Sequence, residues 1–258
     1  MDIVFIRHAE SANNTTWGTV REKFGDTLSP EQFEEECCKL HNADPGLSTK
    51  GLAQADKLKE FISAGGLTEV AKPEDWKIYS SPMYRCMLTN KAVADGFKQP
   101  ATVKAFLFES DGCYRTLPGG GTQGEPGMKA SEVEETFPGF TCVPGEMENG
   151  WYTGTKKETR KEFLDRAQKI ADWLWVLQAQ SVEERGFKTG VVLTVHGNLI
   201  GAILSCLMNT DSLIASDNTG VSHLQLWSDS NGGSDTSTGR RIPSLHYVNK
   251  VDHLRDTP

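Results

Sequence analysis

The sequence lacks any apolar run near the ~20 residues that a transmembrane helix needs. It also lacks the basic start and long apolar core of a secretory signal, so we expect a cytoplasmic protein with no membrane partner. Basic residues are scarce, since 27 Lys and Arg face 35 Asp and Glu and give a net charge of −8. This balance argues against nucleic acid as a partner, and any anion must be held by a local basic pocket.

The six cysteines form no C-x-x-C pair and no regular disulfide framework. A chain of 258 residues folds without disulfide bonds, so we interpret these cysteines as reduced thiols. No linker and no internal repeat divide the chain. We therefore expect a single domain over residues 1–258, and the sequence predicts no particular oligomeric state.

Short apolar segments alternate with segments whose apolar residues have helical spacing. Strands are predicted at 3–6, 76–79, within 101–108, at 190–195 and at 222–227, with a short apolar piece at 245–248. Helices are predicted at 30–40, at 52–62, from Ser81-Pro82 toward Gly96, at 163–177 and at 199–207. No regular element is predicted for the polar stretch 13–26 or for 117–127, and 229–240 is expected to be a surface loop. This order predicts an α/β fold, a three-layer α/β/α sandwich with a mostly parallel central sheet and helices on both faces.

Three strand-to-helix junctions carry unusual polar residues. Arg7-His8 follows the first strand, the segment 80–85 with Arg85 follows the second, and His196-Gly197 follows the strand at 190–195. If these strands are neighbours in a parallel sheet, the junctions lie at the same edge. Guanidinium groups and helix N-termini then favour an oxyanion such as phosphate.

The same residues resemble the histidine phosphatase superfamily, which includes the cofactor-dependent phosphoglycerate mutases. The resemblance rests on RHAESANN at 7–14, LSTKGLAQA at 47–55, YSSPMYR at 79–85, Glu109 and VHGN at 195–198. It covers roughly residues 1–228, although only these blocks match closely. The segment 48–55 is interpreted as structural, with Gly51 supplying close packing.

The resemblance implies a role for each matching residue. His8 is the implied nucleophile, and Glu109 the acid that protonates the leaving alcohol and then activates water. Arg7, Arg85, His196, Asn14 and Gly197 are the implied phosphate-binding set.

The physical demands of phosphoryl transfer agree with these roles, since the reaction needs positioning and cations around the nucleophile. Neighbouring Arg7 is expected to disfavour an imidazolium at His8. Asp111 and Glu125 remain alternatives to Glu109 as the acid. Ala9 stands where the family usually has Gly, which is tolerated if its φ is negative.

A rival interpretation is a zinc site built from His8, Glu10 and His196. The spacing of these residues lacks the i, i+4 pair of helical zinc motifs, so no metal is expected. The expected partner is a small phosphorylated substrate, and no cofactor is expected for hydrolysis.

The sequence favours a phosphatase over a mutase. The arginine that follows the acid in the glycolytic mutases is missing, and only Tyr114 and Arg115 remain as substitutes. About thirty residues, within an insert at about 15–44, also replace a short loop. A mutase would need 2,3-bisphosphoglycerate as primer. A catalytically idle binding module is the third hypothesis.

The segment at about 110–155 is predicted to form a lid, with the glycine-rich stretch 118–127 as a mobile part of it or a plain surface loop. Acidic residues in the insert and the lid would repel a highly anionic substrate. Lys129, Lys156 or Lys157 would have to fold over the pocket to offset this repulsion.

Overall fold

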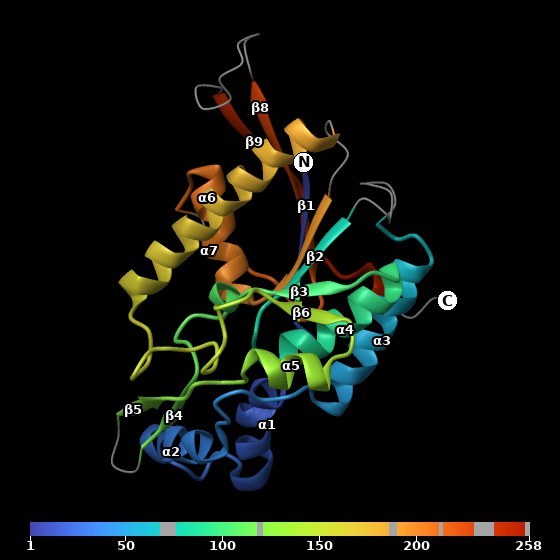
Figure 1. The fold of residues 1–258 in the computed structure, drawn as a ribbon. Coiled ribbons are helices and arrows are strands. Elements are labelled where there is room, and N and C mark those ends of the chain that lie inside the picture. The colour runs from blue at the N-terminus through green and yellow to red at the C-terminus, as the bar shows by residue number, and fades with distance from the viewer. Residues whose placement is uncertain (68–75, 118–120, 186–189, 212–213, 230–239, 256–258) are drawn as a thin grey trace.

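The computed structural model describes residues 1–258 except 68–75, 118–120, 186–189, 212–213, 230–239 and 256–258. A seven-stranded sheet runs through it in the order β6-β3-β2-β7-β1-β8-β9 (Figure 1). These strands are β1 (Asp2–Arg7), β2 (Trp76–Ser80), β3 (Ala101–Val103), β6 (Phe140–Cys142), β7 (Gly190–Val195), β8 (Val221–Asp229) and β9 (Arg240–Lys250). Neighbouring strands from β6 to β1 pair in parallel. Strand β8 pairs antiparallel with both β1 and β9.

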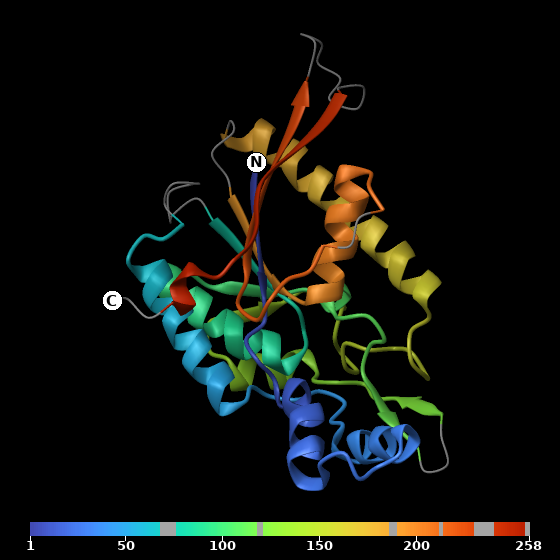
Figure 2. The same ribbon diagram turned by 180° about the vertical axis from the view of Figure 1, so that it is seen from behind.

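Helices cover both faces of this sheet. They are α1 (Ala12–Phe24), α2 (Pro30–Leu40), α3 (Thr49–Ser63), α4 (Tyr84–Phe97), α5 (Ala130–Thr136), α6 (Arg160–Arg185) and α7 (Gly197–Met208), with 3-10 turns η2 (Ala105–Leu107) and η3 (Asp252–Leu254). Figures 1 and 2 show α6 and α7 on one side and α3 and α4 on the other. A separate hairpin of β4 (Tyr114–Thr116) and β5 (Thr122–Gly124) lies beside α2.

Alternation along β1 shows how the apolar strands hold these layers together. Ile3 and Phe5 belong to the core cluster shared with α6 and α7. Val4 and Ile6 belong to the cluster shared with α3 and α4. All four side chains are fully buried, which explains the continuous apolar run. The predicted three-layer α/β/α fold is confirmed.

Several local predictions differ from the structure. Most of the stretch 13–26 belongs to α1 (Ala12–Phe24), which is largely polar, buries Thr16 and Val20, and so shows no apolar periodicity. Helix α4 begins at Tyr84 rather than at Ser81-Pro82. The segment 117–127 includes the short β5. Strand β9 (Arg240–Lys250) extends beyond the predicted 245–248; its residues are all exposed or half-buried, so the sequence shows no apolar run over its full length. Most of the predicted loop 229–240 lies outside the described residues.

The sheet order decides where the polar junctions lie. Strand β7 lies between β1 and β2, and both pairings are parallel. Arg7 pairs with Val195, and Ser80 pairs with Thr194, so the three strands end at the same edge. The expectation that these strands are neighbours is confirmed.

Gly51 provides a test of close packing beneath this edge. A Cβ at Gly51 would collide with the backbone oxygen of Glu10, in the segment that follows His8. Gly51→Ala is therefore expected to lower the free energy of unfolding by about 2 kcal/mol, measured by urea denaturation. Gly18→Ala is the matched control, because a Cβ there meets nothing within 4 Å in the exposed part of α1. This control is expected to raise stability by roughly 0.5–1 kcal/mol, and an equal loss in both variants would contradict the packing argument.

Among the described residues, none of the helices has the length and apolar character needed to cross a membrane.

Candidate active site

A cavity of about 240 Å³ opens where β1, β2 and β7 end. Its lining includes the adjacent Arg7 and His8 at the end of β1, Asn14 of α1, Arg85 of α4 and Glu109. The predicted residues His196 and Gly197 do not line the cavity. His196 is fully buried and contacts Arg85 from behind, and a Cβ at Gly197 would lie 3.4 Å from the Arg7 Nε.

Arg85 connects the two histidines. Its Nε donates to His8 Nε2 at 3.2 Å, and its Nη2 lies 3.2 Å from His196 Nδ1. The imidazole centroids are 5.2 Å apart. Arg85 is only 9% exposed, so its charge acts within a poorly hydrated site. One cation therefore touches both rings at once.

Both rings are held neutral. Burial, followed by the positive charge of Arg85, lowers the pKa of His8 and the pKa of His196 well below the usual histidine value. Arg85 contributes more to the His8 shift than Arg7, which the sequence had singled out. His8 Nδ1 lies 2.7 Å from the backbone oxygen of Ala9, so we assign the proton to Nδ1. The lone pair is then on Nε2, toward Arg85.

Ser81 holds the far side of the His196 ring, with its Oγ 2.7 Å from His196 Nε2. Since Arg85 can only donate, Nδ1 of His196 accepts and Nε2–H donates to Ser81. The Ser81 Oγ thus contacts a histidine and also accepts the backbone N–H of Met83 at 3.3 Å, while the helix itself begins at Tyr84. No sequence signal marked this contact between Ser81 and His196.

If the chain has the phosphomonoester hydrolysis expected from its sequence, Ser81→Ala is expected to lower its kcat about tenfold, because the substitution removes the group that fixes the His196 tautomer. Nitrogen NMR of the His196 ring would report the tautomer directly. Ser80→Ala is the control, since Ser80 is equally buried but its hydroxyl, among the described residues, donates to the backbone oxygen of Ser81 and contacts neither histidine. An equal loss of activity in the two variants, with an unchanged His196 spectrum, would contradict this role.

Arg7 and Asn14 complete the polar wall. Arg7 Nη1 donates to the backbone oxygen of Ser216 at 2.6 Å, while its buried Nε has no partner among the described residues. Asn14 Oδ1 accepts from the backbone N–H of Ser11 at 3.0 Å, which leaves its amide nitrogen to donate. Asn218 donates to the backbone oxygen of His8 at 2.9 Å and fixes the turn after β1.

Glu109 lies at the N-terminus of α7. Its carboxylate accepts the backbone N–H groups of Asn198 at 3.2 Å and Leu199 at 3.1 Å. Burial raises the pKa of Glu109 even though these bonds favour the ionised form. The alternative acids, Asp111 and Glu125, are both engaged in ion pairs. Asp111 forms an ion pair with Lys157 at 2.9 Å, and Glu125 forms one with Arg115 at 2.8 Å.

Asp44 is a further buried carboxyl that the sequence analysis missed. It accepts the backbone N–H of Tyr84 at 2.8 Å, at the N-terminus of α4. Burial raises its pKa to about 6. An ionised Asp44 offsets the unfavourable position of Arg85 in the first turn of that helix. No motif marks Asp44, because its role depends on a contact across forty positions.

The turn after β1 contains Ala9 and Glu10, which bear on the backbone strain and on the zinc interpretation. Glu10 bonds Ser48 at 2.8 Å and Lys50 at 3.0 Å, so its carboxylate is committed to α3 and not to a shared site with His8. Among the described residues, no cluster of three or more His, Cys, Asp or Glu is arranged to hold a metal ion. Ala9 does not have a positive φ, so the alanine is accommodated without strain.

One known protein family matches the chain over most of its length. The family model of the histidine phosphatase superfamily (branch 1) matches residues 3–232. The chain belongs to the histidine phosphatase superfamily. This match spans β1, α4 and β7, so the resemblance seen in the sequence blocks is confirmed.

Solved structures of similar fold include several phosphatases. Glucosyl-3-phosphoglycerate phosphatase from mycobacteria is 17% identical at a TM-score of 0.52, covering 95% of this chain and 98% of the other. Ecdysone phosphate phosphatase from Bombix mori is 17% identical at 0.54, covering 87% and 88%. Phosphoserine phosphatase from Entamoeba histolytica is 17% identical at 0.50, covering 98% and 99%. A search of curated protein sequences found no significant match. At these identities the likeness shows the histidine phosphatase fold.

Proposed function

We propose that this protein hydrolyses phosphomonoesters through a phosphohistidine formed on His8. The observation that carries the proposal is the Arg85 guanidinium, which contacts both buried, neutral histidines at 3.2 Å. A phosphoryl group has the oxygens to replace the histidines as partners of these N–H groups. Binding would then release the Nε2 lone pair of His8 for attack.

In the first step, His8 Nε2 attacks phosphorus and the bond from phosphorus to the ester oxygen breaks. Protonated Glu109 gives its proton to the leaving oxygen, so the alcohol departs neutral. Arg7, Arg85 and Asn14 hold the phosphoryl oxygens during this transfer. His196 donates to an oxygen through Nδ1 in its other tautomer, in which its single proton has exchanged from Nε2 to Nδ1 and the Ser81 hydroxyl donates to Nε2.

In the second step, ionised Glu109 takes a proton from water. The water oxygen attacks phosphorus, the bond from phosphorus to His8 breaks, and inorganic phosphate leaves. Both residues return to their starting protonation states, so the cycle balances without an added reactant. The proposed reaction needs no metal and no organic cofactor.

A second anion site would favour a mutase, and the charges around the cavity argue against one. Arg115 is paired with Glu125, and Lys157 is paired with Asp111. Burial and the nearby charge of Arg85 lower the pKa of His41, which is therefore neutral. Hydrolysis is thus proposed ahead of phosphoglycerate mutation, and a catalytically idle binding module is the remaining alternative.

The test is phosphate release from a panel of phosphomonoesters in the presence of a chelator. The panel contains ethyl phosphate, phosphoserine and 3-phosphoglycerate, the last with and without 2,3-bisphosphoglycerate. Phosphate release that exceeds isomerisation is expected, together with a phosphoenzyme that is labile in acid and stable in alkali. Dominant isomerisation would favour the mutase, and the absence of both reactions would favour the binding module.

A further inference from the structure

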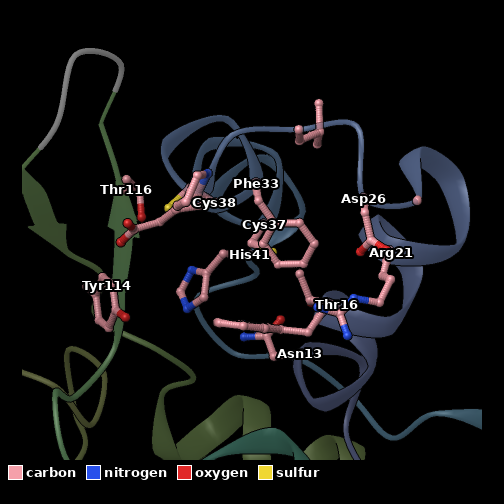
Figure 3. A pocket seen from close by; sticks show the side chains of 15 residues that line it. Asn13, Thr16, Arg21, Asp26, Phe33, Cys37, Cys38, His41, Tyr114 and Thr116 are labelled. Carbon is pink, nitrogen blue, oxygen red and sulfur yellow. The ribbon is translucent and has the colours of Figure 1, made fainter.

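A second cavity, of about 730 Å³, lies beside the candidate active site (Figure 3). It is enclosed by α1, α2 and β4, and it shares Asn13, His41 and Tyr114 with the smaller cavity. The His41 and Tyr114 rings stack at 4.9 Å where the two cavities meet. The organic part of a bound phosphomonoester lies outside the phosphate site, so it can extend into this neighbouring cavity. Its volume is typical of a small-molecule site.

Aromatic and apolar side chains form much of the lining of this second cavity. Trp17 of α1 is 69% exposed although it is a large aromatic residue. Its ring meets Phe33 of α2 edge-on at 5.3 Å, and Leu28 lines the same space. An exposed tryptophan beside a concave surface is typical of a ligand contact. Figure 3 shows the Phe33 and His41 rings pointing into this space.

The charges of the same cavity do not suit a second anion. Among the described residues that line it, Arg21 is the single Lys or Arg, while Asp26 and Glu34 are acidic. Figure 3 shows Arg21 and Asp26 together at the end away from Tyr114. His41 is neutral, and its buried Nδ1 has no hydrogen-bond partner among the described residues. A buried nitrogen without a partner is costly, so the His41 ring is expected to turn its Nδ1 toward a ligand hydroxyl in the cavity that it lines.

We propose that this cavity binds the organic part of the substrate, and that this part is an uncharged aromatic or aliphatic alcohol. A hydroxyl close to the ester oxygen forms a hydrogen bond with His41 Nδ1. The inference rests on the proposed phosphatase activity and deepens it by naming a substrate class. It assigns specificity to the insert formed by α1 and α2.

A groove of about 920 Å³ between α6 and α7 is the competing location, and it meets the active site at Ser110, Asp111 and Asn198. Its lining contains one aromatic residue, Phe163, whereas Trp17, Phe33, His41 and Tyr114 all line the cavity beside α1 and α2. None of the unpartnered buried polar atoms among the described residues lies in this groove. The aromatic cavity is therefore the better match for an apolar alcohol.

The first experiment compares naphthylethyl phosphate with ethyl phosphate. Both esters release primary alcohols of similar basicity, so their difference in kcat/KM reports binding of the organic part and not leaving-group chemistry. We expect naphthylethyl phosphate to exceed ethyl phosphate at least tenfold, and to exceed 3-phosphoglycerate by more. Turnover without this preference would overturn the inference and leave the phosphatase intact. No turnover of either ester would instead count against the phosphatase itself.

Trp17→Ala is expected to lower the ratio of the two kcat/KM values about tenfold. Trp17 is exposed, so the variant is expected to fold. Leu164→Ala is the matched control, because Leu164 is a similarly exposed residue of the competing groove, at 44%. A selective fall with Leu164→Ala, and none with Trp17→Ala, would place the organic part in the groove between α6 and α7.

The contact with His41 has its own test. A naphthylethyl ester with a hydroxyl on the second carbon is expected to exceed the parent ester severalfold in kcat/KM. His41→Phe keeps a ring against Tyr114 but removes Nδ1, so it should abolish this gain. If the gain persists in His41→Phe, the hydrogen bond to Nδ1 is wrong.

Discussion

His8→Ala is expected to lower kcat/KM for every hydrolysed phosphomonoester by about 10⁴-fold or more, since it removes the atom to which phosphorus is transferred. The remaining Arg7 and Arg85 would still bind phosphate, but water would have to attack directly. Phosphate release measured with ethyl phosphate, at saturating and subsaturating concentrations, checks this result. The phosphoenzyme expected of the wild type should be absent from the variant.

His8→Asn separates the chemistry from the packing. His8 is buried at 3% exposure and its Nδ1 bonds the Ala9 backbone oxygen, so the alanine variant leaves both a void and an unpaired oxygen. Asparagine retains a donor for that oxygen but has no nucleophilic nitrogen. Comparable losses in the two variants, with phosphate binding retained by calorimetry, would support His8 as the nucleophile. More than about 1% residual activity in His8→Asn would contradict a phosphohistidine route.

The central layers of the fold were predictable because the apolar pattern within each strand or helix already indicates which of its residues are buried. Strands β1 and β7 are continuous apolar runs that are buried on both faces, and α7 shows a clear apolar stripe. Helix α1 was not predictable by the same criterion, because it is polar nearly throughout. The start of α4 was misplaced since Ser81-Pro82 has the sequence of a cap, whereas Ser81 instead contacts His196 from a distant strand end.

The residues of the candidate site likewise divide into those that the sequence predicted and those that it did not. Arg7, His8, Arg85 and His196 were predicted to meet because each follows a strand, and the sheet order brings three strand ends together. Asp44, Asn218 and His41 were missed because they lie outside the matched blocks and reach the site through long-range contacts. The chemical roles assigned to all these residues stay predictions until kinetics tests them.

Glu109→Gln is expected to show the second-largest effect, and the size of the effect should depend on the leaving group. Hydrolysis of ethyl phosphate should fall by about 10³-fold, because an alkoxide needs a proton to leave. With nitrophenyl phosphate the first step should fall by less than about tenfold, since nitrophenolate leaves without one. A burst of nitrophenolate followed by slow phosphate release is therefore the expected kinetic signature.

This dependence on the leaving group also separates catalysis from structure. Both carboxylate oxygens of Glu109 accept backbone N–H groups of α7, and a glutamine nitrogen would face one of these donors. The variant is therefore expected to lose about 1–2 kcal/mol of stability. A purely structural defect would lower the first step equally for both esters. That equality would exclude Glu109 as the acid and return attention to Asp111.

The pH profile offers an independent check on the same carboxyl. The free enzyme reacts with Glu109 protonated and His8 neutral. Burial raises the pKa of Glu109, while burial and Arg85 lower the pKa of His8 well below its usual value. For ethyl phosphate, kcat/KM should therefore decline as pH rises through the Glu109 pKa, and on the acid side only below the lowered His8 pKa. In Glu109→Gln the alkaline decline due to the enzyme should vanish, whereas ionisation of the ester affects both proteins alike. An unchanged alkaline limb would mean that another group supplies the proton.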